Sequence, residues 1–366
     1  MAADFQKFMA EATRLTRAGD LHAATALIQQ ALSERRFAAE APPAQGDVID
    51  IVAREVTPAE PAILLPLSPL QPLPEGPVQA PPAGQGHVEA GRFGQGRAAR
   101  DFKLFVPPRG ARPGRKPLVV MLHGCTQNPD DFAAGTRMNE LARAQGIYVL
   151  YPAQSRQANP QGCWNWFKAS HQQRSRGEPA LLAGMTRWVI EHHDIDPSQV
   201  YVAGLSAGGA MAAILGQAYP DLFAAVGVHS GLPPAAAKDL PGALAAMKGQ
   251  GGHAQGALRV PTIVFHGDAD PTVHPCNGEQ LFAAAPGERH TLRRDTVRVH
   301  GARRSATRHR RTRADGKVVA EHWVVHGSGH AWSGGHHAGS HCDPEGPDAS
   351  AEMLRFFLEH RLDKGR

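Results

Sequence analysis

The sequence predicts an α/β protein in which a mainly parallel β-sheet is flanked by helices. Short apolar, β-branched segments alternate with longer segments whose apolar residues recur at helical spacing, and this alternation is typical of a parallel sheet between helices. The segments predicted as strands are residues 102–106, 118–122, 147–151, 224–228, 262–265 and 322–325, together with the run that begins at Val200. The segments predicted as helices are residues 138–145, 178–193 and 353–362, together with the run that ends at Leu215. Ligands bind beyond the carboxyl ends of the strands in such sheets, and the reactive residues of this chain follow several strands.

Residues 200–211 contain the most informative stretch of the sequence. An apolar, β-branched run leads into Gly204-x-Ser206-x-Gly208, and apolar residues at helical spacing follow. This is the pattern of a nucleophile elbow, a strained turn that points a serine hydroxyl outward. The glycines are needed because larger side chains would collide with the neighbouring strand and helix. An ordinary turn serine is the alternative, but the strand before and the helix after favour a nucleophile.

An acid is expected after the strand at residues 262–265. A serine at neutral pH needs a base, and a third group must orient that base. The chain order expected in this type of fold is serine, acid, histidine. Asp268 and Asp270 both follow this strand. We predict Asp270 as the acid, because it lies deeper in the loop and precedes a proline that stiffens it, and we interpret Asp268 as a turn residue.

The histidine predicted as the base is His330. The chain has 20 histidines, so the residue type alone carries little information. His330 stands out because it follows the last predicted strand, with small residues before it that let the loop approach the elbow. The other histidines nearby are interpreted as a strand end (His326) or as loop surface (His336, His337 and His341).

The residues that follow His330 include several side chains of the types that bind metals. His336, His337, His341, Cys342 and Asp343 could be interpreted as ligands, but their spacing matches no zinc pattern. A serine hydrolase of this design needs no metal, and we expect neither a metal nor another cofactor.

The backbone must also supply two N–H groups for the negative charge that develops during acyl transfer. We predict the N–H of Ala207, directly after the nucleophile, and that of Cys125, in the loop after residues 118–122.

Aromatic residues lie close to several of these positions. Trp164, Trp166 and Trp332, with Phe167, are predicted to form an aromatic wall for substrate. Packing in the core is the alternative for each of them.

Charge and hydropathy exclude few classes of protein. The 366-residue chain has a formal net charge of +5, and its basic residues concentrate in residues 289–313. Alternating spacing and the turn residues at 314–317 favour a solvated hairpin over a nucleic-acid surface. No apolar run is long enough to span a membrane. The first residues do not resemble a signal peptide, so we expect a cytoplasmic protein, or a secreted one if the sequence lacks its native N-terminus.

The four cysteines allow three pairings, and the sequence alone does not choose among them. A reducing cytoplasm favours free thiols. Their placement favours two bridges instead, Cys125 with Cys163 beside the site and Cys276 with Cys342 after the acid and the base. Both interpretations stay open.

Composition divides the chain into three parts. Residues 1–35 are predicted to form a helical hairpin, which cannot bury its apolar stripes alone and should dock on the main domain, on a second copy or on a partner such as a granule surface. Residues 36–97 are rich in proline and glycine and predict a linker. Residues 98–362 form the predicted catalytic domain.

Four sequence blocks within residues 98–362 resemble the polyhydroxybutyrate depolymerase family of esterases, within the α/β-hydrolase fold. The blocks are His123-Gly124-Cys125-Thr126-Gln127, Gly162-Cys163-Trp164-Asn165-Trp166-Phe167, Ala203-Gly204-Leu205-Ser206-Ala207-Gly208-Gly209-Ala210-Met211 and Gly329-His330-Ala331-Trp332. The resemblance implies Ser206 as nucleophile, Asp270 as acid and His330 as base. Secreted members carry export signals, whereas this chain begins with the hairpin and the linker.

The residues and the resemblance together predict a serine esterase that acts through an acyl-enzyme. The expected substrates are short hydroxyacyl esters or a polyhydroxyalkanoate-type polyester. One alternative is a carbohydrate esterase of the feruloyl or acetyl-xylan type. Another is a non-catalytic protein associated with polymer granules, although such a protein has no need of a serine, an acid and a histidine together.

Overall fold

The computed structural model describes residues 84–110, 113–250, 258–285, 290–297 and 303–363. The predicted hairpin, residues 1–35, lies outside the described residues, and so does most of the predicted linker, residues 36–97.

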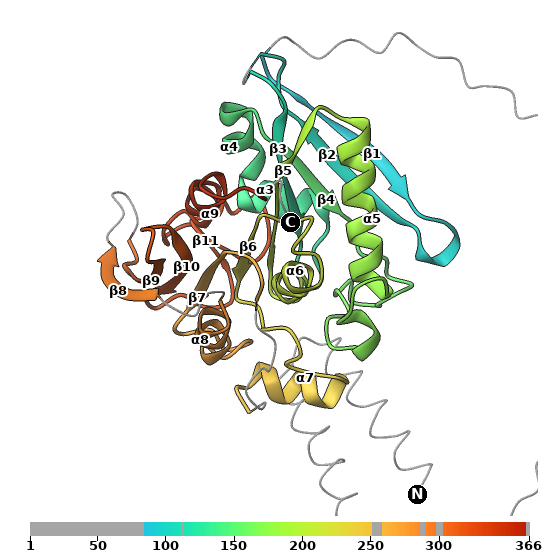
Figure 1. Ribbon diagram of the computed structural model, residues 1–366. Helices are drawn as coiled ribbons and strands as arrows, with labels where there is room; N and C mark the ends of the chain where they lie inside the picture. The colour runs from blue at the N-terminus through green and yellow to red at the C-terminus, as the bar shows by residue number, and fades with distance from the viewer. Residues whose placement is uncertain (1–83, 111–112, 251–257, 286–289, 298–302, 364–366) are drawn as a thin grey trace, which may run out of the picture. The chain divides into compact units, whose positions relative to one another are not determined.

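A ten-stranded sheet runs through the described residues in the order β1-β2-β4-β3-β5-β6-β7-β10-β9-β8 (Figure 1). All neighbours from β4 to β10 pair parallel, whereas the strands at both edges pair antiparallel. The strands are β1 His87–Phe93, β2 Arg100–Val106, β3 Lys116–Leu122, β4 Tyr148–Pro152, β5 Ile195–Leu205, β6 Ala225–His229, β7 Thr262–Gly267, β8 His290–Val297, β9 Ala306–Arg313 and β10 Val318–Val325. The predicted fold class is confirmed.

Helices cover both faces of this sheet (Figure 1). They are α3 Pro129–Thr136, α4 Met138–Gln145, α5 Gly177–His192, α6 Ala207–Ala218, α7 Leu240–Met247, α8 Cys276–Ala283 and α9 Ala349–Leu358, with short 3₁₀ turns at Gly96–Ala98 and Ala169–His171. A separate two-stranded sheet joins β11 Trp332–Ser333 to β12 Cys342–Asp343. None of the described helices has the length and apolar character needed to cross a membrane.

The central strands bury side chains on both faces. Leu118, Val120 and Leu122 of β3 pack in one core with residues of α5 and α6. Val119 and Met121 pack in a second core with residues of α4 and α9. Successive side chains of a strand point to opposite faces, so a continuous apolar run such as residues 118–122 is what a strand covered on both sides requires.

The sheet begins earlier than predicted. β1 lies inside the range assigned to the linker, and it pairs antiparallel with β2 from His87 to Phe93. Most of its residues are exposed, so the strand carries no alternating apolar pattern that the sequence could reveal. The predicted boundary at residue 98 is therefore too late for the sheet.

The basic segment near residue 310 forms the predicted hairpin, with β9 and β10 antiparallel around the turn at residues 314–317. Its arginines are not simply solvated. The guanidinium carbon of Arg308 lies 5.2 Å from the Trp323 ring centroid, and that of Arg311 lies 4.8 Å from the Phe282 ring centroid. These side chains cover aromatic rings on the two faces of the sheet.

Candidate active site

Ser206 lies in the turn between β5 and α6, at the carboxyl edge of the parallel strands. Its φ of 57° and ψ of −119° are rare for a residue with a side chain. The two glycines of the motif are required by close backbone contacts: a Cβ on Gly208 would collide with the carbonyl of Leu122, and one on Gly204 would collide with Gly208. The N–H of Ser206 donates to the carbonyl of His229 at 2.9 Å. This is the geometry of the predicted elbow.

Asp270 and His330 form a buried pair. Nδ1 of His330 lies 2.7 Å from Oδ2 of Asp270, and the side chains are 12% and 0% exposed. The N–H groups of Thr272 and Val273 donate to Oδ1 of Asp270 at 2.8 and 2.9 Å. Burial alone would raise the pKa of Asp270, but the contact with His330 and these backbone donors outweigh it and lower the pKa below its usual value. The carboxylate therefore stays charged and holds the imidazole through Nδ1, which leaves Nε2 as the atom that can accept a proton.

Asp268 holds a different histidine. Its Oδ2 lies 2.8 Å from Nδ1 of His326, and its Oδ1 accepts the N–H of Gly327 at 2.7 Å. Nε2 of His326 is also engaged, by the hydroxyl of Thr307 at 2.9 Å. Asp268 thus fastens the loop after β10 to the loop after β7, a wider role than the turn residue expected from the sequence.

His229, at the end of β6, was not singled out from the sequence. Its carbonyl accepts the Ser206 N–H, and its Nε2 accepts the N–H of Ser333 at 2.9 Å. The ring stacks on Trp332, with centroids 5.1 Å apart. Burial lowers the pKa of His229 to about 3, so the imidazole is neutral. His229 therefore connects the elbow to the loop that carries His330; its position at a strand end is the signal that could have identified it.

The two predicted N–H donors lie on segments that contact each other. Ala207 is the first residue of α6, where backbone N–H groups have no partner within the helix. The glycine that follows it packs against the carbonyls of Leu122 and His123, at the start of the Cys125 loop. In that loop the neighbours of Cys125 are both held: the N–H of Gly124 donates to Gln127 Oε1 at 2.9 Å, and that of Thr126 donates to the Gln161 carbonyl at 2.8 Å.

One of the two predicted disulfides is present. Cys125 and Cys163 are bridged, with an S–S distance of 2.09 Å. The predicted bridge between Cys276 and Cys342 is wrong, because both are free thiols. Cys276 begins α8 and packs against Gly249, whereas Cys342 lies in β12 and packs against Gly135. Following the acid and the base in the sequence does not bring these two cysteines together in the fold.

The tryptophans predicted as a substrate wall are core residues instead. Trp164, Trp166 and Trp332 are 0%, 4% and 1% exposed. The indole N–H of Trp164 donates to the carbonyl of His123 at 3.1 Å, and that of Trp332 donates to Ser350 Oγ at 3.0 Å. These three side chains pack in the core, which is the alternative interpretation of the sequence.

The histidines after His330 do not form a metal centre: in the described part of the chain, no group of three or more His, Cys, Asp or Glu side chains is arranged so that it could hold a metal ion. His336 and His337 lie with their ring centroids 4.4 Å apart. The free thiol of Cys342 has its pKa raised to about 11 by burial, with a smaller contribution from Asp131.

The sheet order and the elbow define an α/β-hydrolase. Acetyl xylan esterase from Aspergillus awamori has a similar fold, with a TM-score of 0.55 and 19% sequence identity over 75% of this chain and 100% of that one. The family model for esterase PHB depolymerase matches residues 100–312, and the chain belongs to this family.

Two curated relatives match parts of the chain. Poly(3-hydroxyalkanoate) depolymerase C of Paucimonas lemoignei is 33% identical over 191 residues, which is 48% of this chain and 46% of that protein. Probable acetylxylan esterase A of Aspergillus fumigatus is 32% identical over 143 residues, 38% of this chain and 37% of that protein. This chain therefore spans less than half the length of either relative.

Proposed function

We propose that this protein is a serine esterase, a carboxylic ester hydrolase that acts on short hydroxyacyl esters or polyhydroxyalkanoate-type polyester. The observation that carries the proposal is the buried Asp270–His330 pair, on the same edge of the sheet as the strained Ser206 turn. The relative named as a polyhydroxyalkanoate depolymerase supports the substrate class.

In the proposed reaction, Nε2 of His330 takes the proton of the Ser206 hydroxyl as its oxygen attacks the ester carbonyl carbon. The carbonyl electron pair moves to oxygen, and the N–H groups of Ala207 and Cys125 donate to the oxyanion. When the tetrahedral intermediate collapses, the alcohol leaves with the proton from His330, and an acyl-enzyme remains. Water then repeats both steps and releases the acid, while Asp270 stabilises the charged imidazole.

A fluorophosphonate probe tests the nucleophile. The wild type should be labelled at Ser206, and Ser206→Ala should lose labelling together with hydrolysis of nitrophenyl esters. A wild type that is neither labelled nor active would instead support the non-catalytic alternative, a protein associated with polymer granules.

A second candidate function is hydrolysis of acetyl or feruloyl esters of carbohydrates, favoured by the relative named as a probable acetylxylan esterase. One screen separates the two: hydroxybutyrate oligomers, nitrophenyl esters of increasing acyl length, acetylated xylan and feruloyl sugars. A kcat/KM highest on the hydroxybutyrate oligomers supports the first proposal, and one highest on the sugar esters supports the second.

We also propose that residues 1–35 attach the enzyme to a polymer or granule surface, or to a second copy. The proposed catalytic groups all lie beyond residue 120, so deletion of residues 1–74 should leave hydrolysis of a small ester nearly unchanged and weaken action on an insoluble polymer. This deletion keeps β1, which pairs with β2. Equal loss on both substrates would favour a hairpin that completes the catalytic domain.

The Cys125–Cys163 bridge bears on location. Disulfides persist in oxidising compartments, so we infer that the protein acts there rather than in the cytoplasm expected from the sequence. Fractionation of the native cells with an antibody to this chain is the test.

A further inference from the structure

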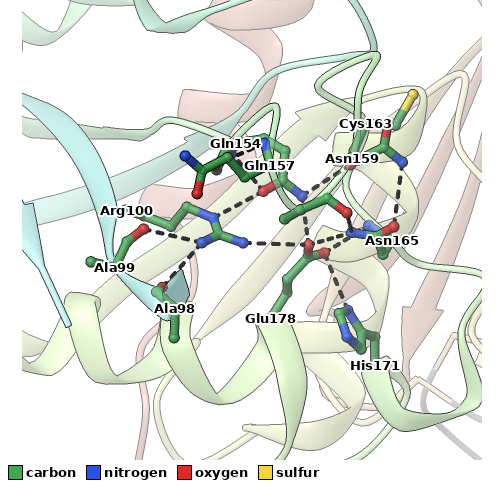
Figure 2. A network of polar contacts seen from close by, with 12 residues as sticks. Ala98, Ala99, Arg100, Gln154, Gln157, Asn159, Cys163, Asn165, His171 and Glu178 are labelled. Atoms are coloured by element: carbon green, nitrogen blue, oxygen red, sulfur yellow. Dashed lines mark hydrogen bonds and ion pairs between the residues drawn. The ribbon is translucent and has the colours of Figure 1, made fainter. Parts of the chain in front are cut away.

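A network of buried polar side chains, which the function proposed above does not use, joins Arg100, Gln154, Asn165 and Glu178 (Figure 2). At its centre is Glu178, the second residue of α5, whose side chain is 3% exposed. A carboxylate this deeply buried is rare unless donors surround it, because burial disfavours the charged form.

Glu178 is surrounded by donors. Its Oε1 accepts from Gln154 Nε2 at 2.5 Å and from Asn165 Nδ2 at 2.7 Å, and its Oε2 accepts the backbone N–H of Asn165 at 2.7 Å. Nη2 of Arg100 lies 4.0 Å from Oε1, and Nδ1 of His171 lies 3.4 Å from Oε2. Burial alone would raise the pKa of Glu178, but the donors around the carboxylate outweigh it and bring the pKa below its usual value.

One route from Glu178 reaches Cys125 through the disulfide. Asn165 binds the carboxylate through both its backbone and its side chain, and Gln154 Nε2 also donates to the Cys163 carbonyl at 2.9 Å. The two residues that flank Trp164 are therefore both held by Glu178, Asn165 directly and Cys163 through Gln154. Cys163, held in this way, is bonded to Cys125.

A second route runs through His123. The backbone N–H of Gln154 donates to Nε2 of His123 at 3.1 Å, so the imidazole carries its proton on Nδ1. Nδ1 then donates to the Gly124 carbonyl at 2.8 Å. That carbonyl belongs to the same peptide unit as the N–H of Cys125. The C=O and N–H of a planar trans peptide point in opposite directions, so a carbonyl held at His123 directs the Cys125 N–H away from it.

We propose that Glu178 is a positioning residue, which through Gln154, His123 and the disulfide orients the Gly124–Cys125 peptide so that its N–H serves as an oxyanion donor. This inference rests on the esterase function proposed above. The interaction acts in the transition state, since the donor must meet the oxygen as it becomes charged. Loss of Glu178 should therefore lower kcat and leave KM almost unchanged.

Glu178→Gln tests this role at constant side-chain size. The new amide has one acceptor oxygen, and its NH₂ must face a position where a donor already points, so the network has to rearrange. We expect kcat for a soluble ester to fall about 10- to 100-fold, less than for outright removal of a donor, with KM within about threefold. Affinity for a boronic acid, which forms a tetrahedral adduct with serine, should fall by a similar factor.

Glu321→Gln is the matched control. Glu321 of β10 is 1% exposed and accepts from Arg355 Nη2 at 2.7 Å and Trp323 Nε1 at 2.9 Å, so it is also a buried carboxylate held by donors. It lies in a different network. The control should lose thermal stability and keep kcat within about twofold of the wild type.

Gln154→Met gives a second measurement if Glu178→Gln does not fold. It removes the side-chain bonds to Glu178 and Cys163 but keeps the backbone N–H that reaches His123, so its kcat should fall by a smaller factor. A kcat within about twofold of the wild type in the folded variants, or an equal fall in Glu321→Gln, would overturn the inference while the proposed function stands. A wild type without esterase activity would overturn the function itself.

Discussion

Two aspartate–histidine pairs follow the ends of β7 and β10, and they differ in ways that bear on the proposed catalysis. Both join the loop after β7 to the loop after β10, and their N–O distances are 2.7 Å for Asp270–His330 and 2.8 Å for Asp268–His326. The first pair is 0% and 12% exposed and the second 41% and 41%. His326 also has its second nitrogen engaged by Thr307. The two pairs thus have the same residue types and similar distances. They differ in burial, and in that Nε2 of His330 is the nitrogen proposed to accept the serine proton, whereas Nε2 of His326 contacts Thr307.

Replacing each histidine in turn gives the largest expected difference between the two pairs. His330→Ala should lower kcat by about 10⁶, as loss of the base does in other serine triads, because an unassisted serine is not deprotonated. His326→Ala should keep kcat within about tenfold, since it disturbs only the join between the two loops. Initial rates on a nitrophenyl ester measure both. Comparable losses in the two variants would show that the exposed pair is catalytic as well.

Replacing the two aspartates compares the same pairs, and the expected loss of kcat is smaller than for the histidines. Asp270→Asn should lower kcat about 10⁴-fold, because an amide in place of the carboxylate favours the wrong tautomer of His330. Asp268→Asn should lower it less than tenfold and should weaken stability slightly, as expected for an exposed pair. The reverse ordering of the two kcat values would assign the acid role to Asp268.

Acid titration tests the burial of two histidines at the ends and centre of the sheet strands, His229 and His322. Burial lowers the pKa of His229 and of His322 to about 3, from about 6.5 in the unfolded chain. The unfolded state binds more protons than the native state between these values, so their contribution to stability is complete above pH 6.5 and is lost as the pH falls toward 3. At pH 5 the two residues together should lower the free energy of unfolding by about 4 kcal/mol relative to pH 7.

Guanidinium unfolding at pH 7 and pH 5 measures this loss. His322→Gln carries no titrating group at that position, so its loss of unfolding free energy between pH 7 and pH 5 should be smaller than that of the wild type by about 2 kcal/mol. An unchanged pH dependence in this variant would mean that His322 is not the source.

Most of the fold, and the contact between Asp270 and His330, could be predicted from the sequence for reasons that are largely local. The run at residues 118–122 is apolar throughout because β3 is covered on both faces, and the glycines around Ser206 are dictated by collisions within a few residues. Asp270 and His330 could be chosen because both follow strands that end at one edge.

What the sequence did not reveal depends on contacts between distant segments. β1 has little apolar alternation because it is an exposed edge strand. The tryptophans were predicted to line the substrate site, but Trp332 packs its ring against Phe132 and His229. The pairing of Asp268 with His326, and the free state of Cys276 and Cys342, are set by where loops meet in space. The helix α3 was not among the predicted helices. Its start could have been recognised from Asn128 as the cap and Pro129 as the first residue, but its apolar stripe is short.

The bridge between Cys125 and Cys163 means that two chemical species share this sequence, one of them heavier by two hydrogen atoms. They differ at the peptide that we propose faces the substrate oxygen. A preparation made with a strong reductant and one made without it therefore contain different molecules at that position. The intact mass of each batch, measured before rates are compared, shows whether the bridged or the reduced species was assayed.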